Sequence, residues 1–200
     1  MTVVAGCAGK NSSTDNIVST ETEVNAEETA AQSETGTFSS ADMFTERDLA
    51  GTYEESEAVY VTLSDDGITG ETDGVAINGQ TVTITEEGTY VFSGTLSEGQ
   101  IVVDADDAKV QIVLDNVDIT CASSAAVYVK SAEKVFVTLA EGSQNTLRNT
   151  DEYVAIDDNN IDAVIFAKSD LTLNGTGSLT IVSAEGHGIV SKDDLKITGG

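Results

Sequence analysis

A phrase that recurs in the last third of the chain constrains the fold more than any other feature. Residues 164–173 and 189–198 share a pattern of apolar residues, lysine and aspartate, and their equivalent lysines lie 24 residues apart. An earlier copy at 127–137 carries a lysine at the same point. Repeats of about 20 to 50 residues are typical of solenoids, and these copies have the composition of strands. The repeat therefore predicts an all-β stack.

Strand-like segments also fill the chain before the repeat. Runs of β-branched and aromatic residues occur at 58–63, 74–77, 81–85, 89–94, 101–104, 110–114 and 117–120. Val110, Val135, Leu171 and Leu195 are equivalent positions, and the longest interval between them is 36 residues because of an extra polar stretch at 145–162. We interpret that stretch as a projecting loop. An antiparallel sandwich would not need the same side chain at the same point of every turn, so the spacing predicts a right-handed parallel β-helix.

The β-helix is expected to occupy residues 41–200. A short helix or turn is predicted near 41–49, capped by Ser40 or Asp42. The sequence stops at Ile197-Thr-Gly-Gly, in the middle of a predicted turn of the solenoid. Because an uncapped end would expose apolar ladders and strand edges, we expect further turns after Gly200 and an incomplete solenoid here.

The first 40 residues have a different character. Val-Ala-Gly-Cys7 resembles the lipobox of bacterial lipoproteins, in which the cysteine becomes lipidated, although most of a signal peptide is missing. The alternative is a chance Ala-Gly-Cys. The Ser/Thr/Glu-rich residues that follow contain few large apolar groups, so we expect a flexible acidic linker. The prediction is a lipid-anchored extracellular protein, attached to the membrane only through Cys7.

The charge of the chain excludes several kinds of partner. The formal net charge is -26, with 35 acidic and 9 basic residues, so neither nucleic acid nor an anionic membrane surface is an expected partner. The apolar runs are too short to span a bilayer. Tryptophan is absent, so Tyr53 and Tyr153 in their polar surroundings are the better candidates for stacking on sugars. We expect a monomer.

Three stretches, at 42–49, 82–96 and 191–200, resemble a clostridial carbohydrate-binding β-helix family. The resemblance spans roughly residues 41–200. It implies a secreted or surface-attached protein with a fold similar to that of pectate lyases. It also implies calcium binding and affinity for plant cell-wall polysaccharides, including cellulose and polygalacturonate, without established lyase activity. His187 stands where family members commonly have aspartate, so a metal ligand at that position is not expected.

Oxygen-bearing side chains are densest at 157–162. Calcium takes about six to eight oxygen ligands, and this segment could supply several of them. A second set lies at the next corner and one repeat later. The candidate metal ligands are Asp157, Asp158, Asn160, Asp162, Asp170, Asp193 and Asp194. The spacing is not that of an EF-hand, and the alternative is a set of solvated acids.

Lys130, Lys168 and Lys192 fall at one position of three successive copies. Aligned like charges repel unless other groups compensate. One interpretation is a basic strip that binds the carboxylates of an acidic polysaccharide, together with Tyr153. The other is that each lysine pairs with a nearby acid, namely Glu133, Asp170 or Asp194.

Three functions follow from these features. The leading hypothesis is non-catalytic, calcium-assisted binding of a plant cell-wall or other acidic polysaccharide. The second is a calcium-dependent polysaccharide lyase, although Arg148 is the only arginine in the strand region and could serve as base only from a loop. The third is a structural adhesin or spacer.

Overall fold

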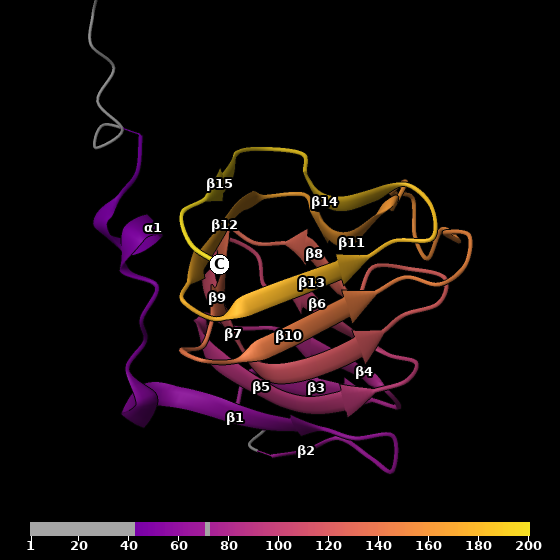
Figure 1. Cartoon of the computed structure of the whole chain (residues 1–200), viewed down its shortest axis with the longest axis horizontal. Helices are drawn as coiled ribbons and strands as arrows, with labels where there is room; N and C mark the ends of the chain where they lie inside the picture. Colours follow the sequence, from indigo (N-terminus) through magenta and orange to yellow (C-terminus); the bar gives the residue numbers. More distant parts are fainter. Residues whose placement is uncertain (1–42, 71–72) are drawn as a thin grey trace, which may run out of the picture. The chain divides into compact units, whose positions relative to one another are not determined.

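The computed structural model describes residues 43–70 and 73–200, which form one short α-helix, one 3-10 turn and fifteen strands (Figure 1). The predicted linker at 1–40 and Cys7 lie outside these residues. No helix in the described ranges is long and apolar enough to cross a membrane. The elements are α1 (Glu46–Ala50), η2 (Glu55–Glu57), β1 (Ala58–Leu63), β2 (Thr69–Gly70), β3 (Val75–Asn78), β4 (Thr81–Ile84), β5 (Gly88–Leu96), β6 (Gln100–Asp104), β7 (Lys109–Thr120), β8 (Val127–Ser131), β9 (Lys134–Leu139), β10 (Gln144–Arg148), β11 (Ala163–Ala167), β12 (Asp170–Gly175), β13 (Ser178–Val182), β14 (His187–Ser191) and β15 (Leu195–Ile197).

The strands form two sheets (Figure 1). The nine-stranded sheet has the order β15-β12-β9-β7-β5-β1-β2, with β10 pairing β7 and β13 pairing β10. The six-stranded sheet has the order β14-β11-β8-β6-β4-β3. Both sheets are mixed: β1–β2 and β3–β4 are antiparallel, whereas the pairs between strands further along the chain, such as β9–β12 and β8–β11, are parallel.

The prediction of a right-handed parallel β-helix was therefore wrong, because the structure consists of two mixed sheets. The antiparallel pairs arise where the chain reverses through a tight turn. Between β3 and β4 the reversal uses Gly79 and Gln80, and Gly79 has φ 60°. A glycine with positive φ at the first central position of a two-residue loop is typical of a β-hairpin. Asn78-Gly79 between two apolar runs was the hairpin signal in the sequence.

The aligned positions were nevertheless predicted correctly. Val135 pairs with Val110 on one side and with Leu171 on the other, and Leu171 pairs with Leu195. The first three side chains are fully buried, whereas Leu195 at the edge of the sheet is 42% exposed. The main apolar core is built from residues of both sheets, including Val61, Phe92, Ile112, Ile84, Ile101 and Val129.

Residues 44–57, which we call the strap, pack on the opposite face of the nine-stranded sheet from the main core. α1 begins after Thr45, whose hydroxyl accepts a hydrogen bond from the Asp48 backbone, while the Asp48 carboxylate accepts one from the Thr45 backbone. This capping box shows that the predicted caps, Ser40 and Asp42, were wrong. The predicted short helix itself is present.

A row of buried amide and hydroxyl groups holds the strap on the sheet. Gln111 donates to the Thr52 carbonyl at 3.1 Å and to the Thr138 hydroxyl at 2.8 Å. Thr138 donates to Asn174 at 2.7 Å, and Asn174 donates to the carbonyls of Arg47 and Asp48. Because buried polar groups are costly without partners, this row and the strap stabilise each other.

Candidate functional site

The three lysines predicted to align do lie in one row. Lys130 is in β8, Lys168 directly follows β11 and Lys192 directly follows β14. The Lys168 backbone donates to the Val129 carbonyl at 3.0 Å, and the Lys192 backbone donates to the Ala167 carbonyl at 2.9 Å. These bonds continue the parallel pairing of the six-stranded sheet. We call Lys130, Lys168 and Lys192 the lysine row.

Each member of the lysine row has a different environment. Lys130 Nζ lies 2.6 Å from Asp104, whose hydrogen bond and charge raise the pKa of the ammonium. Lys192 Nζ lies 5.0 Å from the centre of the Phe166 ring, a cation–π contact. Within the described residues Lys168 has no ion pair.

The alternative prediction was that each lysine of the row pairs with Glu133, Asp170 or Asp194, and these partners were wrong. Glu133 pairs with Lys109 at 3.0 Å, and Asp170 accepts from the Asp194 backbone at 3.3 Å. Among the described residues of the row only Lys130 forms an ion pair with a nearby acid, through Asp104. The charge of Lys168 lowers the pKa of Asp157, but Lys168 has neither the ion pair of Lys130 nor the aromatic contact of Lys192.

The segment 149–162, which we call the covering loop, does not project as predicted. The first residues of the predicted loop, 145–148, belong to β10 instead, and the covering loop lies over the outer face of the six-stranded sheet. Ile161 of the loop packs there with Tyr128 and Phe166, whose ring centres lie 6.0 Å apart. The loop buries an apolar patch that would otherwise face solvent.

Asp157 fixes the covering loop to the sheet. The Tyr128 hydroxyl donates to Asp157 Oδ2 at 2.6 Å, and Asn159 donates to Oδ1 through both its backbone and side-chain nitrogens at 2.8 Å. The hydrogen bond from Tyr128 lowers the pKa of Asp157, and the charge of Lys168 contributes. Burial and the hydrogen bond to Asp157 raise the pKa of Tyr128. Asp157, predicted as a metal ligand, therefore serves as a hydrogen-bond acceptor in this structure.

A cavity of about 310 Å³ opens at the corner where the covering loop meets the turn before β14. Tyr153 lines this corner cavity, and its hydroxyl lies 3.1 Å from that of Ser183. Burial raises the pKa of Tyr153. The remaining lining residues are Glu152, Ala155, Asn160, Ile161, Asp162, Glu185 and Gly186. Oxygen atoms therefore dominate the polar part of its wall.

Asp162 Oδ1, Asn149 Oδ1 and Ser124 Oγ are buried oxygen atoms without a hydrogen-bond partner among the described residues, and of these three residues only Asp162 lines the corner cavity. Asp162 lies three residues before Ile165, and Ser124 lies three residues before Val127. Ile165 and Val127 are paired in neighbouring strands of the sheet. Asn149 is 1% exposed, and its amide nitrogen donates to the Ala122 carbonyl at 2.7 Å. Such atoms are costly to bury unless another group satisfies them.

The predicted metal ligands do not form one cluster. Asn160 and Asp162 line the corner cavity, and Asp158 of the same segment is exposed. Asp170 is the first residue of β12, and Asp193 and Asp194 lie in the turn that precedes β15. In residues 43–70 and 73–200, no three His, Cys, Asp or Glu side chains come close enough to hold a metal by themselves. A cation at the corner would therefore need amide or carbonyl oxygens as well.

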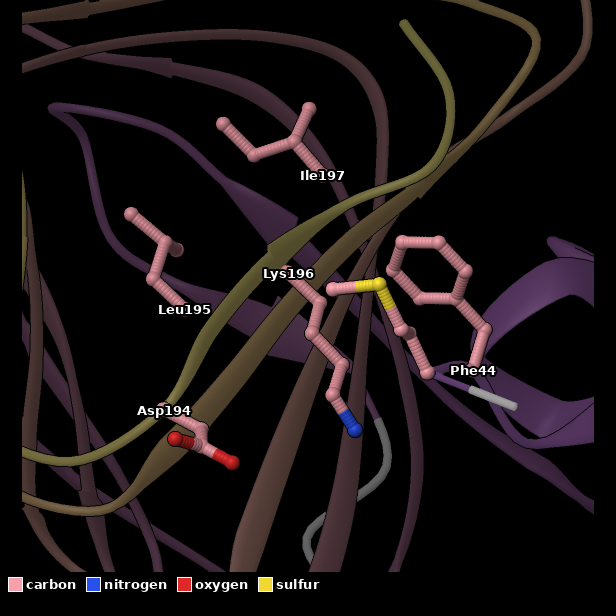
Figure 2. A pocket seen from close by; sticks show the side chains of 6 residues that line it. Phe44, Asp194, Leu195, Lys196 and Ile197 are labelled. Atoms are coloured by element: carbon pink, nitrogen blue, oxygen red, sulfur yellow. The ribbon is translucent and has the colours of Figure 1, made fainter. Parts of the chain in front are cut away.

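A second cavity, of about 360 Å³, lies between the start of the strap and β15 (Figure 2). In Figure 2 Lys196 extends to the same side of its strand as Phe44, whereas Leu195 and Ile197 extend to the other side. Lys196 Nζ lies 3.2 Å from Asp48. The ion pair between Lys196, which lines this cavity, and Asp48 therefore helps to hold the strap on the sheet.

Sequence reasoning missed the most strongly perturbed charged group. Asp48 is fully buried and is bound by Lys134 at 2.6 Å, Lys196 at 3.2 Å and the Thr172 hydroxyl at 2.7 Å. Burial alone would raise its pKa, but the hydrogen bonds from Lys134, Thr45 and Thr172 outweigh burial and hold the pKa well below its ordinary value. The Thr45-x-x-Asp48 spacing was the available signal.

A family model and a known protein that are similar to this chain have the same description. Residues 78–200 match a family described as carbohydrate-binding domain-containing protein. A curated relative with the same description, from Acetivibrio thermocellus, is 44% identical over 131 residues, which is 64% of this chain and 46% of the relative. The chain thus spans less than half the length of that relative.

A solved structure is also similar. It is the polysaccharide lyase-like protein from C. thermocellum, in a gadolinium derivative, with a TM-score of 0.67 and 40% sequence identity. The match covers 72% of this chain and 59% of the other.

Proposed function

Because the chain belongs to the family of carbohydrate-binding domain-containing proteins, we propose that it binds an acidic polysaccharide of the polygalacturonate type without cleaving it, with calcium assisting. The observation that carries this proposal is the lysine row. Three of only nine basic residues lie side by side on one sheet of a chain with net charge -26. Neighbouring strands are about 4.8 Å apart, so these ammonium groups repel one another. Carboxylates of a uronate chain would relieve that repulsion, with Lys168 as the first contact.

Calcium is the cation that the corner cavity would suit. It takes oxygen ligands from carboxylates, amides and carbonyls, and the buried Asp162 Oδ1 in the wall of the cavity has no hydrogen-bond partner among the described residues. Asp162 would be its first ligand, with Asn160, Glu152 and Glu185 in the same wall. The ion would supply positive charge between an acidic protein and an acidic ligand.

The first test is titration of the protein with hexagalacturonate by calorimetry, in calcium and in EGTA. We expect binding in calcium and a loss of about tenfold or more in Lys168→Gln, since one charge-assisted contact is worth about 1.5 kcal/mol or more. The matched control is Lys109→Gln, because Lys109 is a half-exposed lysine paired with Glu133 away from the row. Equal binding by both variants would refute the role of the lysine row.

The calcium proposal has a readout that does not depend on sugar. A ligand that binds only the folded state raises the unfolding midpoint, so calcium should raise it in the wild type and not in Asp162→Asn. Asp158→Asn is the matched control because Asp158 is exposed. A midpoint that does not change with calcium, or that rises equally in all three proteins, would exclude the corner site.

Lyase activity is the second candidate, raised by the lyase-like relative. The side chain of Arg148, the arginine available in the strand region, is paired with Asp118, which favours binding over catalysis. Rapid formation of unsaturated uronate, seen as ultraviolet absorbance and abolished by EGTA, would establish a lyase instead. If no polysaccharide of a broad panel binds with calcium present, the chain is a structural spacer.

We also propose that the protein is extracellular, lipid-anchored through Cys7 and monomeric. The Val-Ala-Gly-Cys sequence supports the anchor. Incorporation of labelled fatty acid into the wild type and not into Cys7→Ser would test the anchor, and sedimentation of the soluble Cys7→Ser protein would test the monomer.

A further inference from the structure

A third cavity, of about 370 Å³, lies where the strap crosses the nine-stranded sheet. It is separate from both the lysine row and the corner cavity, which belong to the other sheet and the covering loop. Its volume is within the range of small-molecule sites, about 300 to 1,000 Å³. The lining residues are Gly51, Thr52, Tyr53, Glu55, Asp115, Ala140 and Glu141.

Tyr53 is held firmly in this strap cavity. It packs against the buried side chains of Ala58, Val91 and Val113 and remains partly exposed. The preceding Thr52 carbonyl accepts the hydrogen bond from Gln111 at 3.1 Å. An aromatic ring that is fixed before binding loses little conformational entropy when a ligand arrives.

The backbone next to Tyr53 is equally constrained. Gly51 has φ 57°, and a Cβ at this position would lie 2.6 Å from the Gly175 backbone nitrogen. Only glycine can bring the strap so close to the sheet. On the other side of Tyr53, the Tyr60 hydroxyl donates to the Glu55 carbonyl at 3.3 Å.

The charged side chains that line the strap cavity are all carboxylates. Glu55, Asp115 and Glu141 contribute carboxylates, and none of the lining residues is basic. One oxygen of Asp115 accepts from Asn116 at 2.7 Å, which leaves the other free. Carboxylates accept hydrogen bonds from hydroxyl groups, but they repel the carboxylates of a uronate.

We propose that the strap cavity is a second saccharide-binding site, selective for neutral, hydroxyl-rich sugars. The exposed part of the Tyr53 ring supplies the apolar surface for the C–H face of a sugar ring. Glu55, Asp115 and Glu141 accept hydrogen bonds from its hydroxyls. The site does not depend on calcium or on the lysine row. Calcium and the lysine row favour ligands that carry carboxylates, whereas the strap cavity disfavours them.

The test is a titration of the isotope-labelled wild-type protein in EGTA, followed by nuclear magnetic resonance. The probes are neutral hexasaccharides (cellohexaose, mannohexaose and xylohexaose), hexagalacturonate and a glucosamine hexamer. At least one neutral probe should shift the amides of residues 51–55 and 140–141, and hexagalacturonate should not. If no neutral probe shifts these amides, or if only the glucosamine hexamer does, the proposal is overturned.

Two substitutions sharpen the result. Tyr53→Ala should weaken neutral-sugar binding about tenfold. Glu141→Lys, at an exposed position, should weaken it severalfold without disturbing the fold. The matched control is Lys168→Gln, which should change hexagalacturonate binding in calcium and leave the neutral sugar unaffected. Unchanged neutral-sugar binding in Glu141→Lys, together with amide shifts elsewhere, would place the sugar at another site. Loss of the lysine-row function alone would leave this site intact, so the two proposals fail separately.

Discussion

Both sheets have their outer face covered by a segment that one carboxylate fastens, but the two carboxylates are placed very differently. Asp48 of the strap is fully buried and carries its charge between Lys134 and Lys196. Asp157 of the covering loop is partly exposed and is held by Tyr128 and Asn159. A buried charge is tolerated only when it is paired and hydrogen-bonded, whereas a partly exposed one can exchange its partners for water.

This difference separates a structural face from an accessible one. Opening the strap would leave a buried carboxylate, two lysines and a row of amides without partners. Opening the covering loop would expose an apolar patch and release one tyrosine hydroxyl. We infer that the strap opens only with global unfolding, and that the covering loop, beside the lysine row and the corner cavity, responds to ligands.

The largest expected effect comes from removing the charge of the strap. Asp48→Ala should lower the free energy of unfolding by about 3 kcal/mol or more, because breaking a buried ion pair leaves its partners uncompensated. Urea denaturation measures this change. The matched control is Glu46→Ala in the same helix, since Glu46 is exposed. Similar losses in both variants would mean that helix α1, rather than the buried charge, stabilises the strap.

Acid should weaken the attachment of the strap to the sheet. The pKa of Asp48 lies below its ordinary value of 3.8, so its contribution is fully present above pH 3.8 and is lost as pH falls below that value. The free energy of unfolding of the wild type should therefore decrease more steeply on acidification below pH 3.8 than that of Asp48→Asn. Parallel pH profiles would contradict the assignment.

A smaller effect is expected at the covering loop. Tyr128→Phe removes the hydrogen bond to Asp157 and should lower the free energy of unfolding by about 1.5 to 3 kcal/mol, typical of a hydrogen bond to a charged group. Hydrogen exchange of the loop amides, including Asn159, should accelerate while amides of β9 and β12 keep their protection. Tyr60→Phe, which loses a bond to a backbone carbonyl at an exposed site, is the control. Uniformly faster exchange would show that the loop is part of the global fold.

The smallest effect on stability is expected in the lysine row. Lys130→Gln removes an exposed ion pair with Asp104, and such pairs contribute little. The unfolding midpoint should be unchanged within error, while hexagalacturonate binding in calcium weakens. A clear fall in the midpoint would mean that the row is structural rather than a binding surface.

The candidate site was predicted in part. The alignment of the lysine row followed from counting residues between copies of one phrase, because parallel pairing repeats its register. The composition identified the acidic segment 157–162, but it did not show which of its residues attach the loop and which line a cavity. Asp157 accepts hydrogen bonds while Asp162 lines the corner cavity, and that depends on which side chains of the sheet lie beneath the loop.

The sequence alone was enough for the all-β character, most of the strand positions and the registers that place Val110, Val135, Leu171 and Leu195 in one line. Local composition and spacing carry that information, since side chains of a strand alternate with period two. The mixed sheets, the covering of both outer faces and the partners of Asp48 were decided only by the tertiary structure. Asp48 and Thr172, for example, are 124 residues apart, and contacts at such separations follow from packing rather than from any local pattern.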